Sequence, residues 1–337
     1  MATPTTSNHN RDVQYMRRAL GLAAKGAALA SPGVMVGALI VGNKILGRGY
    51  YTYDDVIHAE IKALNLAGDA ARGATAYTTL EPCSHHGRTG PCSQALIGAG
   101  IVRVVTAMQD PNPSVNGRGI AMLRAAGVEV EVGILEDEAK RLNEAFITYK
   151  TQRRPFGILK VAMTLDGKIA TRFGESQWIT SEAARAAVQD LRHRVDAVVT
   201  GSGTFLKDNP RLTDRTGLLR RRELLRVVLD RRGRITNAPD FTIFRGDLKG
   251  LSEELYRREI QSFMLECGPD LAFNALRSGI IDKIVVFAAP KILGGREIPA
   301  IGGEGFDRLT EAMTLDNMAI SNAGPDLVIT AYVHRNH

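Results

Sequence analysis

The hydrophobic pattern of this chain alternates between strand-like runs and helical spacing. Over the first 150 residues the two patterns follow one another, which predicts an α/β sandwich. Helices are expected over residues 12–29, 58–67, 92–100, 119–126 and 136–150. Strands are expected over residues 34–41, 45–51, 74–79, 102–107 and 128–132, with Gly42-Asn43 as the turn between the first two.

A second α/β pattern begins after the segment 151–155, with a β-rich run over 156–162. A chain of 337 residues exceeds one ordinary core, so we expect two domains, residues 1–150 and residues 151–337. No Gly-x-Gly-x-x-Gly follows a strand in the second half. A Rossmann fingerprint is therefore absent, and a dinucleotide would be held by other means.

Composition argues against a membrane protein and a secreted one. Hydrophobic residues make up 44% of the chain, but no apolar run is long enough to span a bilayer. The first ten residues are polar and contain no apolar segment, which is typical of a frayed tail and not of a signal peptide. We therefore expect a cytoplasmic protein.

The net charge of +7 raises the question of an anionic partner. Basic residues cluster at 220–222 and at 231–232, but aromatic residues make up only 6% and do not interleave with them. Because stacking platforms for bases are not evident, phosphorylated small molecules explain the charge better than nucleic acid does. For the cluster that begins at Arg220, a solvated basic face without a partner is the alternative.

Three short motifs predict a catalytic zinc site with a proton shuttle beside it. They are His58-Ala59-Glu60, Glu81-Pro82-Cys83 and Pro91-Cys92. One imidazole and two thiolates supply three ligands (His58, Cys83, Cys92), so the fourth tetrahedral position stays open for water. Glu60 lies two residues past the ligand and is expected to relay protons, as in the zinc deaminases of nucleobases. The predicted helix starts at the ligands favour thiolates.

A structural disulfide is the alternative to zinc binding for Cys83 and Cys92. Only three Cys occur, the third being Cys267, and no secretory segment indicates an oxidising compartment. Zinc is therefore favoured for Cys83 and Cys92. Cys267 is expected to be a small buried residue.

The segment 79–92, together with Met108-Gln109-Asp110-Pro111-Asn112-Pro113, resembles the bifunctional deaminase/reductases of riboflavin biosynthesis. An eight-residue insert separates the two cysteines, where nucleic-acid deaminases have two residues. Its His85 and His86 are expected to face the substrate and not to form a second metal site. The resemblance implies a cytidine-deaminase-like α/β/α sandwich and a dihydrofolate-reductase-like α/β domain that binds NADPH.

Residues 160–168, 174–180, 203–215 and 266–274 carry the resemblance through the second half. It implies cofactor contacts from Ala162, Trp178, Thr204, Asp208, Gly268, Pro269, Asp270, Leu271, Ala272, Phe273 and Asn274. It implies substrate contacts from Ser176, Arg192, Leu212, Arg215 and Glu266. The turn that begins at Gly268 would hold the pyrophosphate at a helix N-terminus, and the fork of Arg215 would suit a phosphate. Lys160 and Asp166 are candidates to assist ring opening of the ribose.

Two positions depart from the family. Gly33 stands where the family has an Asn that is expected to bind the pyrimidine, and Val34 stands for the following Pro. Gly33→Asn is therefore expected to raise deaminase efficiency, unless Met35 or a neighbouring backbone group already fills the role. Arg231 stands where the family has Ser after Val-Leu-Asp, and the segment 234–262 looks short, which puts cofactor binding in question.

The resemblance thus implies a two-step enzyme of flavin synthesis that uses zinc and NADPH on phosphorylated pyrimidines. It would deaminate diaminohydroxyphosphoribosylaminopyrimidine and then reduce the ribosyl group to ribityl. We expect a homo-oligomer with no nucleic-acid or membrane partner. Two alternatives stay open: a reductase whose deaminase domain is impaired, motivated by Gly33, and a nucleic-acid base deaminase.

Overall fold

The computed structural model describes residues 6–85, 90–112 and 115–334, and it divides into two compact units, Met1–Arg153 and Arg154–His337. The predicted linker at 151–155 spans the point of division. Each unit has its own sheet and its own buried apolar cluster. None of the described helices is long and apolar enough to cross a membrane.

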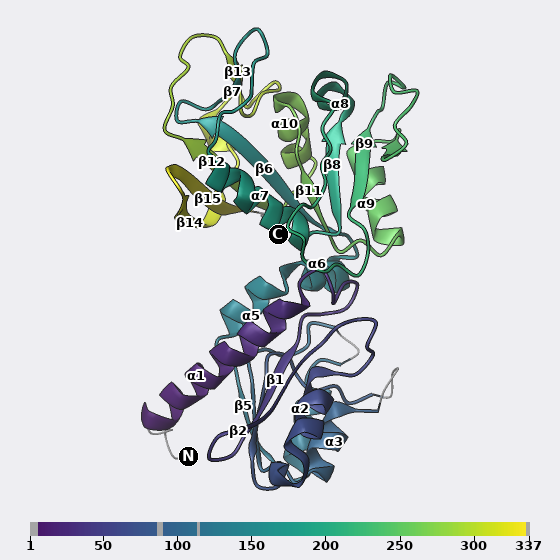
Figure 1. The fold of residues 1–337 in the computed structure, drawn as a ribbon, viewed down its shortest axis with the longest axis vertical. Coiled ribbons are helices and arrows are strands. Elements are labelled where there is room, and N and C mark those ends of the chain that lie inside the picture. Colours follow the sequence, from purple (N-terminus) through teal and green to yellow (C-terminus); the bar gives the residue numbers. More distant parts are fainter. Residues whose placement is uncertain (1–5, 86–89, 113–114, 335–337) are drawn as a thin grey trace. The chain divides into compact units, whose positions relative to one another are not determined.

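The first unit is built on a five-stranded sheet in the order β2-β1-β3-β4-β5. Its strands are β1 (Gly37–Val41), β2 (Ile45–Tyr50), β3 (Thr75–Thr78), β4 (Arg103–Thr106) and β5 (Glu129–Val132). Its helices are α1 (Thr6–Ala23), α2 (Ala59–Ala67), α3 (Cys92–Gly98), α4 (Arg118–Ala125), α5 (Glu136–Leu142) and α6 (Glu144–Gln152), with 3-10 turns η1 (Ala24–Gly26) and η2 (Gly68–Ala71). Helices α1 and α5 lie on one side of this sheet and α2 and α3 on the other (Figure 1). The predicted α/β/α sandwich is confirmed.

Some predicted boundaries of this unit are wrong. Helix α1 begins at Thr6, so residues 6–10 are not a frayed tail, and residues 34–36 precede the strand instead of starting it. The helix expected over 136–150 breaks at Asn143. There the side chain accepts a hydrogen bond from Met35 N at 2.9 Å and donates one to Met35 O at 3.0 Å. This buried amide binds the loop that contains Met35. Helical spacing along the chain does not reveal such a contact between distant segments.

The second unit is built on an eight-stranded sheet in the order β10-β9-β8-β11-β6-β12-β15-β14. Its strands are β6 (Phe156–Thr164), β8 (Ala197–Gly201), β9 (Leu225–Leu229), β10 (Thr242–Phe244), β11 (Ser262–Leu265), β12 (Lys283–Ala289), β14 (Leu315–Ala323) and β15 (Asp326–Val333). A small two-stranded sheet pairs β7 (Lys168–Ala170) with β13 (Ile298–Pro299). Its helices are α7 (Glu182–Arg194), α8 (Ser202–Asp208), α9 (Leu248–Arg257) and α10 (Pro269–Arg277), with the 3-10 turn η3 (Leu309–Glu311).

Six strands of this sheet, from β10 to β12, are parallel, and β15 and β14 complete it in antiparallel fashion. All five residues of β8 are buried, as expected for a parallel strand covered on both faces. Because parallel strands end at the same edge, the segments that follow β8, β9 and β11 come together there. That edge is where ligands bind in open α/β sheets.

Candidate functional site

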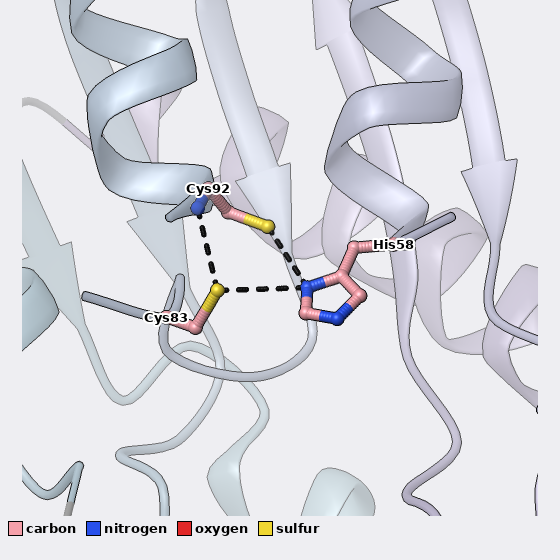
Figure 2. Close-up of side chains that lie close together, drawn as sticks. All are labelled: His58, Cys83 and Cys92. Atoms are coloured by element: carbon pink, nitrogen blue, oxygen red, sulfur yellow. Dashed lines mark hydrogen bonds between the residues drawn. The ribbon is translucent and has the colours of Figure 1, made fainter. Parts of the chain in front are cut away.

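In the first unit, three side chains from separate elements converge on one point. The Nδ1 atom of His58 lies 3.1 Å from Cys92 Sγ and 3.5 Å from Cys83 Sγ, as Figure 2 shows. Potential ligand atoms of the three residues all lie within 4.8 Å of one another. This is the set that the sequence predicted as zinc ligands, and its two thiols and one imidazole are the donors that zinc prefers.

The surrounding fold explains the convergence. His58 is the extended residue before α2, Cys92 is the first residue of α3, and Cys83 follows β3 by a few residues. Both helices therefore present their N-termini to the cluster, and Cys92 N donates to Cys83 Sγ at 3.3 Å. Free N–H groups and the helix dipole favour negative charge at this place.

The pKa values of the three clustered side chains are shifted by the hydrogen bonds among them. A hydrogen bond from the Cys92 thiol, opposed by burial, lowers the pKa of Cys83 to about 4. The same bond raises the pKa of Cys92, and the bond with Cys83 raises the pKa of His58. A divalent cation would replace the protons that these groups share, because each ligand must be deprotonated to bind metal.

Glu60 lies in the first turn of α2, next to the cluster, and is only 4% exposed. Burial raises the pKa of its carboxyl, and the neighbouring His58 opposes that shift. A raised pKa makes this carboxylate a better proton acceptor than an ordinary Glu side chain. The geometry is therefore compatible with the proton relay predicted from the sequence.

Glu81 has a role that the motif analysis missed. Its buried carboxylate accepts hydrogen bonds from four backbone N–H groups, those of Asp110, Gly117, Gly119 and Ile120, at 2.8 to 3.3 Å. It therefore ties the segment 110–120 to the segment that carries Cys83. The sequence shows Glu81 in the Glu-Pro-Cys motif, but it does not show its hydrogen-bond partners, which lie about thirty or more residues further along the chain.

Of the two histidines in the insert, His85 is exposed and His86 lies outside the described residues. Pro113 of the second motif lies outside them as well. Whether the insert faces the substrate therefore stays a prediction.

The expectation for Gly33 needs correction. A Cβ atom at this position would lie 2.8 Å from Ala30 O and 2.8 Å from Cε1 of Tyr51, closer than real contacts allow. An Asn side chain is therefore not accommodated without movement of the turn or of the tyrosine. Gly33 does not have a positive φ, so the obstacle is lack of space and not backbone conformation. The proposed substitute Met35 already has its backbone N–H and C=O bound to Asn143.

In the second unit, all five predicted substrate residues line one cavity of about 550 Å³. They are Ser176, Arg192, Leu212, Arg215 and Glu266. The predicted cofactor residues Ala162 and Trp178 line the same cavity, and Trp178 is 63% exposed instead of belonging to the core. The guanidinium of Arg185 lies over the Trp178 ring at 4.6 Å, a contact that the sequence did not suggest.

Glu266 lies at the centre of a buried ion-pair group in this cavity. Its carboxylate is 2.9 Å from Lys160 Nζ and 2.8 Å from Arg192 Nε. Burial alone would raise the pKa of Glu266, but the two cations outweigh it and lower that pKa to about 2. The group carries one net positive charge, which suits an anionic ligand.

Lys160 and Asp166, both candidates to assist ring opening, have different surroundings. Lys160 lines the cavity. Asp166 accepts hydrogen bonds from Thr164 Oγ1 and from the N–H groups of Leu293 and Gly294. These bonds lower the pKa of Asp166 to about 2, so it holds a turn and a loop as a carboxylate.

A second cavity of about 1080 Å³ lies against the N-terminus of α10. Seven predicted cofactor residues line it, Thr204, Asp208, Gly268, Pro269, Asp270, Leu271 and Asn274. Ala272 and Phe273 are instead buried, so their side chains pack in the protein interior. Gly268 is the extended N-cap, and its side-chain-free backbone leaves the helix N-terminus open to a phosphate. A dinucleotide fits both the size of the cavity and its chemistry.

Arg231, the departure from the family, lines this same cavity. So do Arg232, Arg234 and Lys249, none of which was predicted as a site residue. Ser176, Thr204, Asp208 and Cys267 line both cavities, so the two are neighbours. Cys267 is partly exposed and not fully buried as predicted, but its thiol is enclosed enough that burial raises the pKa to about 12, which agrees with an unreactive side chain.

Arg220 is not part of a solvated basic face. Its guanidinium donates to the carbonyl oxygens of Arg192, His193 and Val195 at the end of α7, and to Asp214. Positive charge at a helix C-terminus satisfies free carbonyls and the helix dipole. Arg220 therefore fixes the turn of helix that presents Arg192 to Glu266.

Comparisons with known proteins cover both units. Residues 9–108 match the cytidine and deoxycytidylate deaminase zinc-binding region, and residues 155–329 match the RibD C-terminal domain. The chain is 41% identical to riboflavin biosynthesis protein RibD of Synechocystis sp., over 96% of this chain and 97% of the relative. It is 39% identical to RibD of Escherichia coli, over 95% of this chain and 98% of the relative.

Solved structures of similar proteins also cover both units of the chain. Acinetobacter baumannii RibD, form 1, superposes with a TM-score of 0.88 at 33% identity, over 97% of this chain and 100% of that one. A diaminohydroxyphosphoribosylaminopyrimidine deaminase/5-amino-6-(5-phosphoribosylamino)uracil reductase from Thermotoga maritima superposes with a TM-score of 0.86 at 34% identity, with the same coverage.

Proposed function

The chain belongs to the RibD family of riboflavin biosynthesis proteins, and from this premise we propose the substrates and the residues of its two half-reactions. The family brings a zinc-dependent deaminase domain and an NADPH-dependent reductase domain. The proposed first substrate is the phosphoribosylated diaminohydroxypyrimidine named for the Thermotoga relative. The deaminated uracil product then becomes the substrate of the reductase.

The observation that carries the deaminase assignment is the buried Glu60 beside His58, Cys83 and Cys92. The latter three would hold zinc, which when bound acts as a Lewis acid that acidifies water. Glu60 would take one proton from the attacking water and pass it to a ring nitrogen, then take the remaining proton of the added hydroxyl and deliver it to the leaving amine. Water is consumed and ammonia is released.

The reductase assignment rests on the two neighbouring cavities of the second unit. The turn at Gly268 and the N-terminus of α10 would hold the pyrophosphate of NADPH, which supplies the hydride. Arg215 at the surface of the substrate cavity would bind the ribose phosphate. Lys160 and Arg192, balanced by Glu266, would orient the ribosyl group.

One experiment tests both halves. The purified protein is analysed for zinc, and ammonia release from the pyrimidine substrate is measured with and without NADPH. We expect about one zinc per chain, as three ligands at one site imply. We also expect ammonia without NADPH, and NADPH oxidation only after deamination. Ammonia release without subsequent NADPH oxidation, or the reverse, would show that one half alone is active. Activity on single-stranded nucleic acid instead would support the base-deaminase alternative.

We also propose a cytoplasmic homo-oligomer. Strand β14 forms an edge of the eight-stranded sheet and is exposed along almost its whole length, including Met318 (66%) and Ile320 (63%). An open apolar edge of this kind is suited to pairing with another chain. Light scattering of the wild type and of Ile320→Lys would test this, with a shift to monomer expected for the variant.

A further inference from the structure

Three consecutive residues of the loop after α8 bind one face of α7. The described segment 209–224 joins α8 to β9 without a helix or strand of its own. Its residues 213–215 make three contacts with α7: Thr213 O with Arg192 Nη1 (3.3 Å), Asp214 Oδ2 with His193 Nδ1 (2.9 Å) and Arg215 N with Gln189 Oε1 (3.0 Å). The helix residues at positions 192 and 193 lie three and four positions after 189, so all three share one face of α7. The loop is therefore held along the helix and not at a single point.

Asp214 differs from its two neighbours because it holds the loop through its own side chain. Its Oδ2 faces His193 Nδ1 and accepts from Arg220 at 3.2 Å, while Oδ1 accepts from the N–H and the hydroxyl of Thr216 at 3.0 and 2.8 Å. The side chains of Asp214 and His193 are only 7% and 9% exposed. Burial would raise the pKa of Asp214, but these hydrogen bonds outweigh it and lower that pKa to about 2. Asp214 is therefore a carboxylate at neutral pH, and each of its oxygens has a partner.

The same loop and the same helix line the substrate cavity. Arg192 of α7 and Arg215 of the loop both belong to its lining. Among the described residues, the hydrogen bond of Arg215 involves its backbone N–H, and its exposed guanidinium stays available to a ligand. A side chain on a loop that is already ordered loses less entropy when it binds an anion. The contacts at residues 213–215 therefore prepare Arg215 for a phosphate.

We propose that Asp214 is a positioning residue of the reductase, which holds the loop on α7 through His193 so that Arg215 reaches the substrate phosphate. The proposal rests on the proposed function of this cavity. Asp214 has the wrong charge to bind a phosphate itself, so it acts through the arginine next to it. Its charge and its position have opposite effects: loss of a nearby negative charge strengthens the binding of an anion, whereas loss of the loop contacts weakens it. The sign of the change in affinity separates the two.

The decisive variant is Asp214→Ala, measured in the full-length, zinc-loaded protein with NADPH. KM for the phosphorylated uracil should rise about tenfold with kcat within about twofold, because binding and not chemistry is affected. KM for the same compound without its phosphate should not change. In an Arg215→Ala background, Asp214→Ala should change KM by less than about twofold, since both act through one contact. Asp190→Ala, which removes an exposed carboxylate from α7, is the matched control and should not raise KM.

A milder variant separates positioning from folding. Thr216→Val keeps the shape of the side chain and removes one hydrogen bond to Asp214, so KM for the phosphorylated uracil alone should rise about threefold. This variant carries the test if Asp214→Ala does not fold. An equal rise of KM for both compounds, a full further loss in the Arg215→Ala background, or a KM that stays unchanged or falls overturns the proposal, while wild-type reduction of the phosphorylated uracil upholds the proposed function. A wild type that does not reduce this compound overturns both.

Discussion

The ammonium of Lys160 in β6 and the carboxylate of Glu266, the residue directly after β11, are 2.9 Å apart. Leu159 of β6 pairs with Leu265 of the parallel strand β11, so the residues that follow these two come side by side at the ligand-binding edge. This register places a buried charge pair at the centre of the substrate cavity.

Glu60→Gln should abolish most deamination without loss of zinc. The amide keeps the shape of the side chain but cannot carry a proton, so the rate should fall at least about 10²–10⁴-fold. Reduction of the preformed uracil intermediate should survive. Ammonia release and zinc content are measured on the same preparation. Substantial ammonia release from a zinc-loaded variant would remove Glu60 from the mechanism.

Glu266→Gln should alter the pH dependence of stability. The pKa of Glu266 is about 2 in the folded protein against an ordinary value of 4.5. A lowered pKa stabilises the fold above about 4.5 and loses this contribution as the pH falls toward 2. At about 1.4 kcal/mol per pKa unit, the contribution is about 3 kcal/mol.

The measurement for Glu266 is denaturant unfolding of the second unit's signals between neutral and acid pH. The variant should be less stable at neutral pH, because Lys160 and Arg192 lose their buried partner, and its stability should fall less on acidification. Glu259→Gln, which removes an exposed ion pair with Arg222, is the control. If the unfolding free energy of Glu266→Gln falls as steeply on acidification as that of the wild type, Glu266 does not stabilise the fold as a buried carboxylate.

Arg215→Ala should weaken only the reductase. Its exposed guanidinium lines the substrate cavity and is proposed to bind the phosphate, so KM for the phosphorylated uracil should rise. Charge-assisted bonds to phosphate are worth about 1.5–3 kcal/mol, which corresponds to roughly ten- to a hundredfold. Deamination should stay within about twofold, because the zinc cluster belongs to the other compact unit of the chain. Parallel loss of both activities would indicate misfolding.

Arg231→Ser should weaken NADPH binding. Arg231 lines the cavity of the α10 N-terminus, where a cation attracts the cofactor's phosphates. Fluorescence titration should show a dissociation constant about tenfold higher. The exposed Arg257, which pairs with Glu254 on α9, is the control for loss of one positive charge. If Arg257→Ser weakens binding equally, only net charge matters; if neither does, Arg231 makes no contact with the cofactor.

Arg220→Ala should destabilise the second unit by about 2–3 kcal/mol. It leaves buried carbonyl oxygens at the end of α7 without their donor, and each unsatisfied group is costly. The shift is measured by chemical denaturation, with exposed Arg194 as the site of a control Ala substitution. If the two variants are equally stable, the cap contributes nothing.

The local motifs by themselves determined where the zinc chemistry is expected in the first unit. His58, Glu60, Cys83 and Cys92 occur in short segments whose residue types predict a zinc ligand set and a proton carrier, and the structure brings His58, Cys83 and Cys92 together. The alternation of apolar runs also determined the α/β class, because helical and strand periodicities are properties of neighbouring residues. The resemblance then predicted substrate residues that the structure collects around one cavity.

Only the tertiary structure decided which distant side chains meet. Asn143 breaks a helix because Met35 lies beside it, and Arg220 caps α7 instead of facing solvent. Gly33 looked like a missing contact until Tyr51 was found in the same space. Each depends on strand register and packing between segments far apart in the chain, and hydrophobic periodicity carries no information about such pairings.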